Sequence, residues 1–329
     1  MDVLWPLSGI QLACTNCKTA LEYADVELAC RACGLRYPMA DGLPNMLTEG
    51  LQGSAEERDL SADAVQKAAV QGVYDAINRT LEEKGISRFS TFINWGYASR
   101  EDGADSGLPG VNQSFVRLLR EIIGSADVVG KDVLEIGCGR GGNVRELCKS
   151  YRAGSVVGID LTPSNIGFCH RSNRYRQAYY CIGDAERLPV RSGCCDFVLN
   201  VESSHLYPNI GRFFAEAYRV LKPGGMLWYA DIMDAPDALR YEELWGRLGF
   251  RTALCRDITD NVLLSADRAL NSRLYALGGS FGSGEGTMEW LEAPGTQKHE
   301  AMKTGKRLFK IVHLVKPNGG GGEERGGLQ

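Results

Sequence analysis

The sequence predicts an α/β fold, in which a mainly parallel sheet carries helices on both faces and a small cysteine-rich module precedes it. Two observations predict the sheet. Short apolar strands alternate with helical segments over residues 126–317, and the first of these strands runs directly into a glycine-rich turn. A third observation, two Cys-x-x-Cys pairs near the N-terminus, predicts the separate module.

The N-terminal module is organised by its cysteines. Cys14 and Cys17 form one pair, and Cys30 and Cys33 form the other. Each pair places two thiolates on a tight turn, and two facing pairs complete a tetrahedral zinc site. A segment as short as residues 1–50 buries too small a hydrophobic core to fold without a metal ion or disulfides. We therefore expect a structural zinc ribbon, and the odd total of 11 cysteines disfavours the alternative of two disulfides.

A linker and a helical cap follow. Residues 51–62 are polar and acidic and read as a linker, and residues 63–125 as the cap. Within the cap, helical spacing predicts a lid-like amphipathic helix from Ala62 to Leu81. Its expected apolar positions are Val65, Ala68, Ala69, Gly72, Val73, Ala76 and Ile77.

Two tyrosines of the cap are candidates to close over a cationic ligand. Tyr74 lies on the predicted helix, and Tyr97 ends the aromatic stretch 92–97. A cation over an aromatic face gains about 0.5–2 kcal/mol. The alternative is that these rings only bury surface against the core.

The first strand of the sheet lies within Lys131 to Asn143, KDVLEIGCGRGGN. Glu135 interrupts its apolar run, and Gly137 and Gly139 open the turn that follows. Glycines let backbone N–H groups approach a ligand at the start of a helix. The spacing also fits the GxGxxG pattern of dinucleotide-binding proteins, and a lone match of that kind is weak.

Carboxylates at the strand ends indicate whether the ligand is a dinucleotide or S-adenosylmethionine. Asp160 ends the second strand (155–159) and Asp184 follows the third (178–182). With Glu135 they would repel a pyrophosphate, whereas S-adenosylmethionine brings an ammonium, a sulfonium and hydroxyls with one carboxylate. We expect this cofactor. Its predicted contacts are Glu135, Gly137, Gly139 and Asn200 at the methionine end, Asp160 with Leu161 at the ribose, Asp184 and Ala185 at the adenine, and Tyr74 and Tyr97 above the sulfonium.

Candidate catalytic residues follow the fourth and fifth strands. The fourth strand (194–202) leads to His205, and the fifth (226–230) ends at Asp231. We expect His205 to act as general base and Asp231 to orient it. The alternative is a structural histidine, because alignment alone can drive methyl transfer. The remaining elements are a helix with Phe213, Ala217, Val220 and Leu221 buried, a turn at 222–225, a helix at 242–248, and strands at 250–255 and 308–315.

Two segments have no clear helix or strand pattern. Residues 266–305 alternate apolar and glycine-rich stretches, and both an acceptor lid and a packed pair of helices fit them. Residues 318–329 read as a flexible tail.

Composition narrows the class of partner. The net charge of −4 over 329 residues shows no excess of lysine and arginine of the kind that binds nucleic acid. No run of 18 apolar residues suits a membrane span, and the N-terminus lacks a signal-peptide pattern, so a cytoplasmic location is expected. We therefore expect a small-molecule acceptor.

The N-terminal module resembles a known protein. LACTNC, LACRAC and RYPMADGLPNML are similar to the zinc-ribbon partner subunit that activates tRNA, rRNA and release-factor methyltransferases. This resemblance implies a stabilising or docking element fused in cis. A homo-oligomer or a protein partner bound through the ribbon stays open.

A second resemblance covers roughly residues 90–265. FINWGY, KDVLEIGCGRGGN, FCHRSNR, GDAERLP, NVESSHLYP, VLKPGG and DITDNV resemble the phthiotriol and phenolphthiotriol dimycocerosate methyltransferase family. The resemblance implies the Rossmann-like class I methyltransferase sheet with a seventh, antiparallel strand. It also implies O-methylation of a polyketide, lipid or similarly apolar hydroxyl.

Two alternatives to this function stay open. One is C- or N-methylation of an isoprenoid or aromatic metabolite. The other is a zinc-ribbon docking module that serves modification of tRNA or protein. The acidic balance disfavours this second alternative, as does the fourth strand, which ends in NVES rather than an NPPY-type motif.

Overall fold

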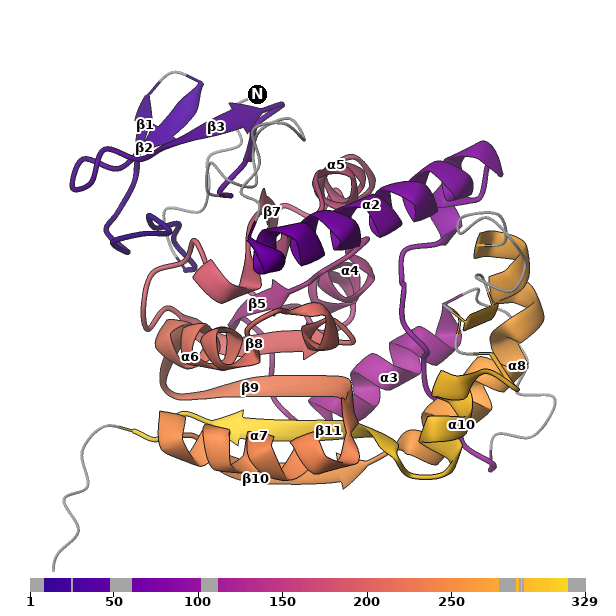
Figure 1. Ribbon diagram of the computed structural model, residues 1–329. Coiled ribbons are helices and arrows are strands. Elements are labelled where there is room, and N and C mark those ends of the chain that lie inside the picture. Colours follow the sequence, from indigo (N-terminus) through magenta and orange to yellow (C-terminus); the bar gives the residue numbers. More distant parts are fainter. Residues whose placement is uncertain are drawn as a thin grey trace, which may run out of the picture.

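A seven-stranded sheet forms the body of the protein (Figure 1). The computed structural model describes residues 9–24, 26–47, 61–101, 112–277 and 288–318, apart from 290 and 292. The strand order is β10-β11-β9-β8-β5-β6-β7, and β11 runs antiparallel to both of its neighbours. The seventh, antiparallel strand is therefore confirmed. The strands are β5 (Asp132–Ile136), β6 (Ser155–Asp160), β7 (Ala178–Ile182), β8 (Cys195–Val201), β9 (Leu221–Asp234), β10 (Arg251–Asp257) and β11 (Arg307–Val315).

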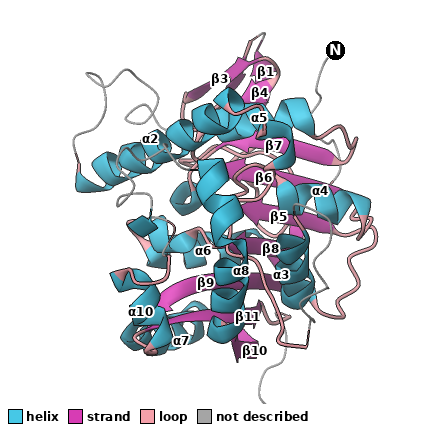
Figure 2. Ribbon diagram, turned by 90° about the vertical axis from the view of Figure 1, so that its right-hand side faces the viewer, coloured by secondary structure: helices cyan, strands magenta, loops and turns pink. Residues whose placement is uncertain are grey.

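Helices cover both faces of this sheet (Figures 1 and 2). On one face, Phe213 and Phe214 of α6 and Trp245 of α7 belong to one buried cluster. On the other face, α3, α4, α5 and α8 contribute to a second cluster. The α/β architecture is as predicted. The helices are α3 (Gln113–Ile123), α4 (Gly142–Lys149), α5 (Pro163–Ser172), α6 (Ile210–Val220), α7 (Ala235–Leu248), α8 (Thr259–Leu277) and α10 (Gln297–Lys303), with short 3-10 turns η1 (Ser87–Phe89), η2 (Ala185–Arg187) and η3 (Ser204–Leu206).

Strand β9 is longer than the sequence predicted. The expected turn at 222–225 lies inside it, because β9 begins at Leu221 beside Cys195. The register then shifts before Met226 pairs with Phe197. Proline cannot donate to a ladder, so this irregular start of β9 accommodates Pro223 within a strand. The helix α7 likewise begins at Ala235, well before the predicted 242–248.

The N-terminal module is a four-stranded sheet joined to the edge of the large one. Its order is β1-β2-β3-β4, with antiparallel neighbours. Asn45 bridges Ile182 of β7, and Leu12 bridges Val190. The module therefore packs directly on the main domain. Its strands are β1 (Glu22–Ala24), β2 (Glu27–Ala29), β3 (Arg36–Ala40) and β4 (Leu43–Pro44).

Helix α2 (Ala62–Glu83) differs from the predicted apolar-faced lid. Val65 is 56% exposed, whereas Lys67, Gln71 and Asn78 are buried. Ile77, one of the predicted apolar positions, is buried with Leu81 and Leu291, so the buried face of α2 combines apolar residues with polar ones.

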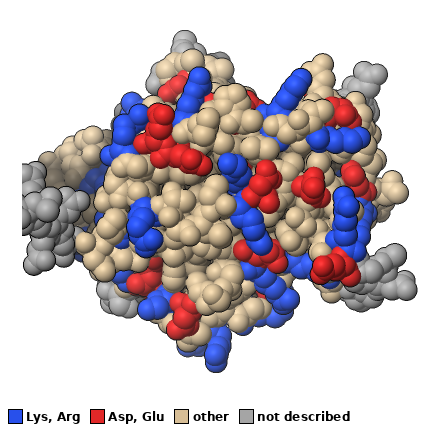
Figure 3. Space-filling view, turned by 90° about the horizontal axis from the view of Figure 1, so that it is seen from below, with Lys and Arg blue, Asp and Glu red and all other residues tan. Residues whose placement is uncertain are grey.

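Several sequence predictions lie outside the described residues. These concern residues 51–60 of the linker, the tail from 319 and residues 278–287 of the segment 266–305. Within the described chain, α8 covers the start of that last segment and α10 lies near its end. The described helices are all too short or too polar to cross a membrane. Figure 3 shows acidic and basic side chains interspersed on the face it presents.

Candidate active site

A cavity lies where β5, β6, β7 and β8 end and α2 crosses them. The crevice at the carboxyl ends of parallel strands is the usual ligand site of such sheets. Most of the predicted cofactor residues line it, namely Tyr74, Glu135, Gly137, Gly139, Asp160, Leu161, Asp184 and Ala185. Tyr97, Asn200, His205 and Asp231 are not among its lining residues.

Glu135 offers a free carboxylate oxygen to this cavity. The residue is 2% exposed, and its Oε1 accepts a hydrogen bond from Asn143 Nδ2 at 2.8 Å. Its Oε2 is buried and has no hydrogen-bond partner among the described residues. Burial raises the pKa of Glu135 to about 8; the hydrogen bond from Asn143 opposes this rise and the charge of Asp160 adds to it. An orphaned carboxylate oxygen suits a cationic donor on a ligand.

The glycine turn closes tightly against the end of β8. Gly137 has φ +71°, and a Cβ there would lie 1.9 Å from Ser203 Oγ and 2.9 Å from Tyr207 Oη. Only glycine fits this position. The neighbouring Gly139 N–H donates to Asp160 Oδ2 at 2.8 Å, which joins the turn to the acid at the end of β6.

Asp160 is held by a set of donors. Besides Gly139, Thr162 N donates at 2.9 Å and Asn165 Nδ2 at 3.1 Å. Burial raises the pKa of Asp160, and these hydrogen bonds oppose the rise. The carboxylate is therefore fixed in direction before any ligand enters.

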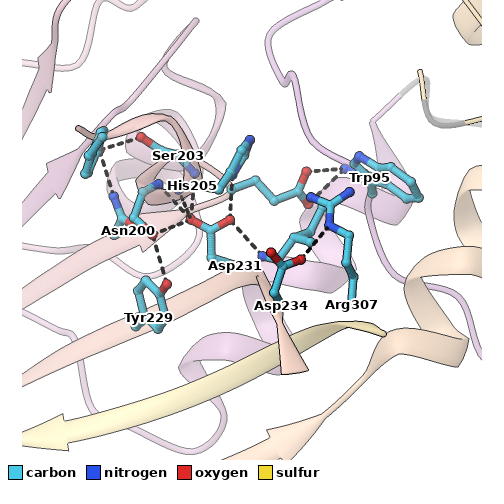
Figure 4. Close-up of polar contacts among 12 residues, drawn as sticks. Trp95, Asn200, Ser203, His205, Tyr229, Asp231, Asp234 and Arg307 are labelled. Atoms are coloured by element: carbon cyan, nitrogen blue, oxygen red, sulfur yellow. Dashed lines mark hydrogen bonds and ion pairs between the residues drawn. The ribbon is translucent and has the colours of Figure 1, made fainter. Parts of the chain in front are cut away.

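His205 and Asp231 form a pair beside the cavity (Figure 4). His205 Nδ1 lies 2.7 Å from Asp231 Oδ1. Asp231 is fully buried and also accepts hydrogen bonds from the N–H groups of Ser203 and Ser204 at 3.0 and 2.7 Å. Burial raises the pKa of Asp231, but the charge and hydrogen bond of His205 reverse this, so the net pKa is lowered. With Nδ1 occupied, the remaining ring nitrogen Nε2 is left to accept a proton.

Comparisons with known proteins agree on one family. Residues 134–229 match a family described as a methyltransferase domain. The chain is 30% identical over 263 residues to a fatty-acid O-methyltransferase of Mycolicibacterium smegmatis, covering 77% of this chain and 92% of that one. It is 33% identical over 241 residues to a phthiotriol/phenolphthiotriol dimycocerosates methyltransferase of Mycobacterium leprae, covering 68% and 85%.

The chain belongs to the S-adenosylmethionine-dependent methyltransferases.

Solved structures agree in fold. A putative sarcosine dimethylglycine methyltransferase from Galdieria sulphuraria superposes with a TM-score of 0.59 at 18% identity, over 74% of this chain and 99% of that one. The [4+2]-cyclase SpnF superposes with a TM-score of 0.61 at 18% identity, over 77% and 97%. These likenesses concern the class I fold and carry no statement about acceptor.

Sequence reasoning missed Lys67, which the methyltransferase places inside the cavity. Its Nζ lies 2.8 Å from both Asp184 Oδ2 and Glu186 Oε2. Burial lowers the pKa of Lys67, but the charges and hydrogen bonds of the two acids raise it overall. The sequence does carry a sign of this arrangement, because Lys67, Gln71, Tyr74 and Asn78 recur at helical spacing on one face of α2.

The other members of this face also hold loops of the cavity. Gln71 Nε2 donates to Leu161 O at 2.9 Å, and Asn78 Nδ2 donates to Asn165 Oδ1 at 2.8 Å. Tyr74 lines the cavity itself. Helix α2 is thus attached over the cavity largely by polar contacts.

Arg140, within the glycine turn, is a second cation that sequence reasoning missed. It is 3% exposed and stacks on Phe168 at 3.6 Å. Its hydrogen bonds go to Ser87 O and Oγ, Ser90 O and Asn78 Oδ1, all neutral acceptors. Burial lowers the pKa of Arg140 to about 10, which leaves it charged at neutral pH. The cavity therefore holds a cation without an acidic hydrogen-bond partner.

The end of β8 contributes a further acid, Glu202. Its backbone is left-handed (φ 47°), which is unusual outside glycine. Both carboxylate oxygens lie 3.0 Å from the N–H of Trp95, and the residue lines the cavity. Glu202 thus joins the aromatic segment to β8. Spacing in the sequence carried no sign of this contact.

Two predicted cofactor residues lie away from the lining. Tyr97 packs against the core cluster of α3 and α4. Asn200 is fully buried, and its Nδ2 donates to Ile136 O at 2.9 Å and to Tyr207 Oη at 3.1 Å. Asn200 therefore supports Tyr207, which does line the cavity.

The four predicted metal ligands converge in the N-terminal module. The Sγ atoms of Cys14, Cys17, Cys30 and Cys33 all lie within 4.8 Å of one another. Zinc–sulfur bonds of about 2.3 Å in a tetrahedron place sulfurs about 3.8 Å apart. The closest pairs here are 3.4 to 3.7 Å. The hydroxyl of Thr19 contacts Cys17 and Cys30, and it lowers the pKa of Cys30 to about 6. The donor set fits zinc.

Proposed function

We propose that the enzyme transfers a methyl group to the hydroxyl oxygen of a polyketide, lipid or other apolar small molecule, with His205 as general base. The His205–Asp231 pair carries this proposal. His205 lies between the cavity-lining residues Ser203 and Leu206, and the contact of its Nδ1 with Asp231 leaves Nε2 to take a proton. A hydroxyl acceptor must lose its proton as the new bond forms, and a positioned base contributes about 10²–10⁴-fold.

The cofactor would lie along the carboxylate-lined wall. S-adenosylmethionine supplies the methyl group from its sulfonium. Glu135 Oε2 would accept from the amino group, and Arg140 would compensate the carboxylate of the methionine end. Asp160 with Leu161 would take the ribose, and Asp184 with Ala185 the adenine.

Part of the cavity lining is apolar and would contact the acceptor. Cavity-lining side chains here include Val70, Phe92, Ile93, Leu206 and Pro208. Such a wall favours a hydrocarbon chain over a charged metabolite. The names of two relatives, a fatty-acid O-methyltransferase and a phthiotriol/phenolphthiotriol dimycocerosates methyltransferase, support an apolar acceptor.

Asp231 would act on His205 rather than on the acceptor. Its buried carboxylate fixes the turn 203–205 and holds Nδ1, so that Nε2 points away from it. This arrangement selects one tautomer and stabilises the imidazolium that forms.

We further propose a structural zinc ion bound by Cys14, Cys17, Cys30 and Cys33. All four positions of the tetrahedron are filled by thiolates, so no site is left for chemistry.

A labelled-methyl experiment tests the proposed reaction. The enzyme is given S-adenosylmethionine with a deuterated methyl group and, in parallel, a long-chain alcohol, the matching fatty acid and the matching amine. We expect a deuterated methoxy signal by NMR from the alcohol, with no product from heat-inactivated enzyme. A methyl group found on carbon or nitrogen would reject O-methylation. Product from the fatty acid alone would reject a hydroxyl acceptor.

A further inference from the structure

The turn that carries Cys14 and Cys17, called here the first knuckle, lies against the loop 182–190. The second knuckle is the turn that carries Cys30 and Cys33. The loop 182–190 holds the proposed adenine contacts Asp184 and Ala185. Leu12 forms an antiparallel bridge with Val190, and Ala13 N donates to Pro189 O at 2.9 Å. These residues immediately precede Cys14. The position of the first metal ligand is therefore tied by backbone hydrogen bonds to the loop after η2.

Lys18, directly after Cys17, strengthens this attachment. Its Nζ donates to Leu188 O at 3.1 Å and forms an ion pair with Glu216 of α6 at 2.9 Å. Its backbone is left-handed (φ 61°), a conformation that the closed knuckle must maintain. If the knuckle opened, the lysine would leave both partners.

The other end of the same loop is also held by the N-terminal module. Met46 N donates to Ile182 O at 2.8 Å, at the end of β7. Asp184 and Ala185 lie between these two points of attachment, and both line the cavity. Ala185 and Leu188 share a buried cluster with Ile10, Leu12, Tyr37 and Met46 of the module.

We propose that zinc binding and cofactor binding are coupled through this loop, with Lys18 as a positioning residue. This proposal rests on the proposed cofactor and zinc sites. A metal-closed knuckle fixes the loop 182–190, so the cofactor does not have to order it on binding. Coupling between two sites is reciprocal, and typical couplings change affinity by about 5–150-fold.

Two variants of the full chain separate docking from metal binding. Lys18→Met removes the contacts to Leu188 and Glu216 and keeps all four cysteines. Arg31→Met is the control, because Arg31 follows Cys30 directly, its side chain is 82% exposed, and its one ion pair among the described residues is with Glu22 of the same module. Zinc content is measured by elemental analysis, and affinity for S-adenosylhomocysteine by calorimetry.

We expect Lys18→Met to retain one zinc per chain and bind S-adenosylhomocysteine about tenfold more weakly, with Arg31→Met unchanged. In the wild-type enzyme, saturating S-adenosylhomocysteine should raise zinc affinity against a competing chelator by the factor by which zinc raises S-adenosylhomocysteine affinity. This rise should be smaller in Lys18→Met, in which the backbone contacts of Leu12, Ala13 and Met46 to the loop remain. A merely structural role for Lys18 would not change that reciprocity.

The coupling would be overturned by two results together. Zinc-bound wild type and zinc-bound Lys18→Met would bind S-adenosylhomocysteine with equal affinity, and zinc affinity would be the same with and without this ligand. The proposed sites fail separately. Wild-type protein that binds no S-adenosylhomocysteine would reject the cofactor site, and protein that binds no zinc would reject the metal site.

Discussion

Glu135 is a single buried acid that can bind the ammonium group of a ligand. It is held by Asn143 on one oxygen and left without a partner on the other. Its raised pKa of about 8 means that the empty protein keeps a proton there at neutral pH. A ligand ammonium would stabilise the carboxylate and displace that proton. Cofactor binding at this residue should therefore be linked to proton release.

Calorimetry in buffers of different ionisation enthalpy measures this linkage. At about pH 6.5, where the amino group of S-adenosylhomocysteine is already charged, we expect release of nearly one proton per ligand bound by the wild type. Glu135→Gln keeps the contact to Asn143 but should release almost none and bind at least tenfold more weakly. Equal proton release by both proteins would remove Glu135 from the amino-group site.

The same residue predicts a change in stability with pH. The folded protein holds this proton where the unfolded chain has lost it, so the contribution of Glu135 to the free energy of unfolding falls as pH rises from 4.5 to about 8. Without ligand, Glu135→Gln should therefore melt at a higher temperature than the wild type at about pH 8. The difference should shrink by about pH 5; thermal melts that show the opposite trend would contradict the protonated state.

His205 carries the proposed base chemistry. Replacing it with alanine should lower kcat for a hydroxyl acceptor by about 10²–10⁴-fold. Affinity for S-adenosylhomocysteine should not change, because none of the proposed cofactor contacts involves His205. His170→Ala, on α5, is the control. Normal turnover by His205→Ala would leave orientation alone as the source of catalysis.

At the scale of elements, polar contacts hold α2 over the cavity. Lys67 pairs with Asp184 and Glu186, and Gln71 and Asn78 bind the loops after β6. In the N-terminal half of α2, water can replace such contacts when the helix moves away, whereas Ile77 and Leu81 near its C-terminal end are buried in an apolar cluster with Leu291. We infer that α2 opens to exchange the cofactor.

Stopped-flow binding tests this inference. Lys67→Met removes both ion pairs, so α2 should open more often and S-adenosylhomocysteine should dissociate about tenfold faster, equivalent to about 1.4 kcal/mol. Arg79→Met, exposed on the same helix, should behave as the wild type. An unchanged dissociation rate in Lys67→Met would indicate that α2 does not limit exchange.

The limits of sequence reasoning are clearest in this helix. Val65 and Ala69 were expected to face the core, yet both are exposed, since α2 covers a polar crevice. In contrast, the strand-end acids Glu135, Asp160 and Asp184 were located correctly in the cavity, because strand period and glycine spacing fix where a parallel strand ends. Arg140 could not be predicted, because its partners Ser87 and Asn78 are distant in sequence and meet it only after folding.

At the scale of the whole molecule, the N-terminal module is part of the core. The sequence indicated a small sheet with four converging cysteines, and both are present. What it could not indicate was where the module packs. Leu12 and Tyr37 join the cluster that contains Phe213 of α6, so the module covers the sheet beside that helix. Docking of this kind depends on complementary shapes that no local pattern records.

A crystal structure with S-adenosylhomocysteine and an apolar acceptor tests the central claim most directly. We predict the amino group of the ligand against Glu135 Oε2, the ribose at Asp160, and the acceptor oxygen within hydrogen-bonding distance of His205 Nε2. An acceptor oxygen remote from His205, or a cofactor bound away from Glu135 and Asp160, would contradict the account.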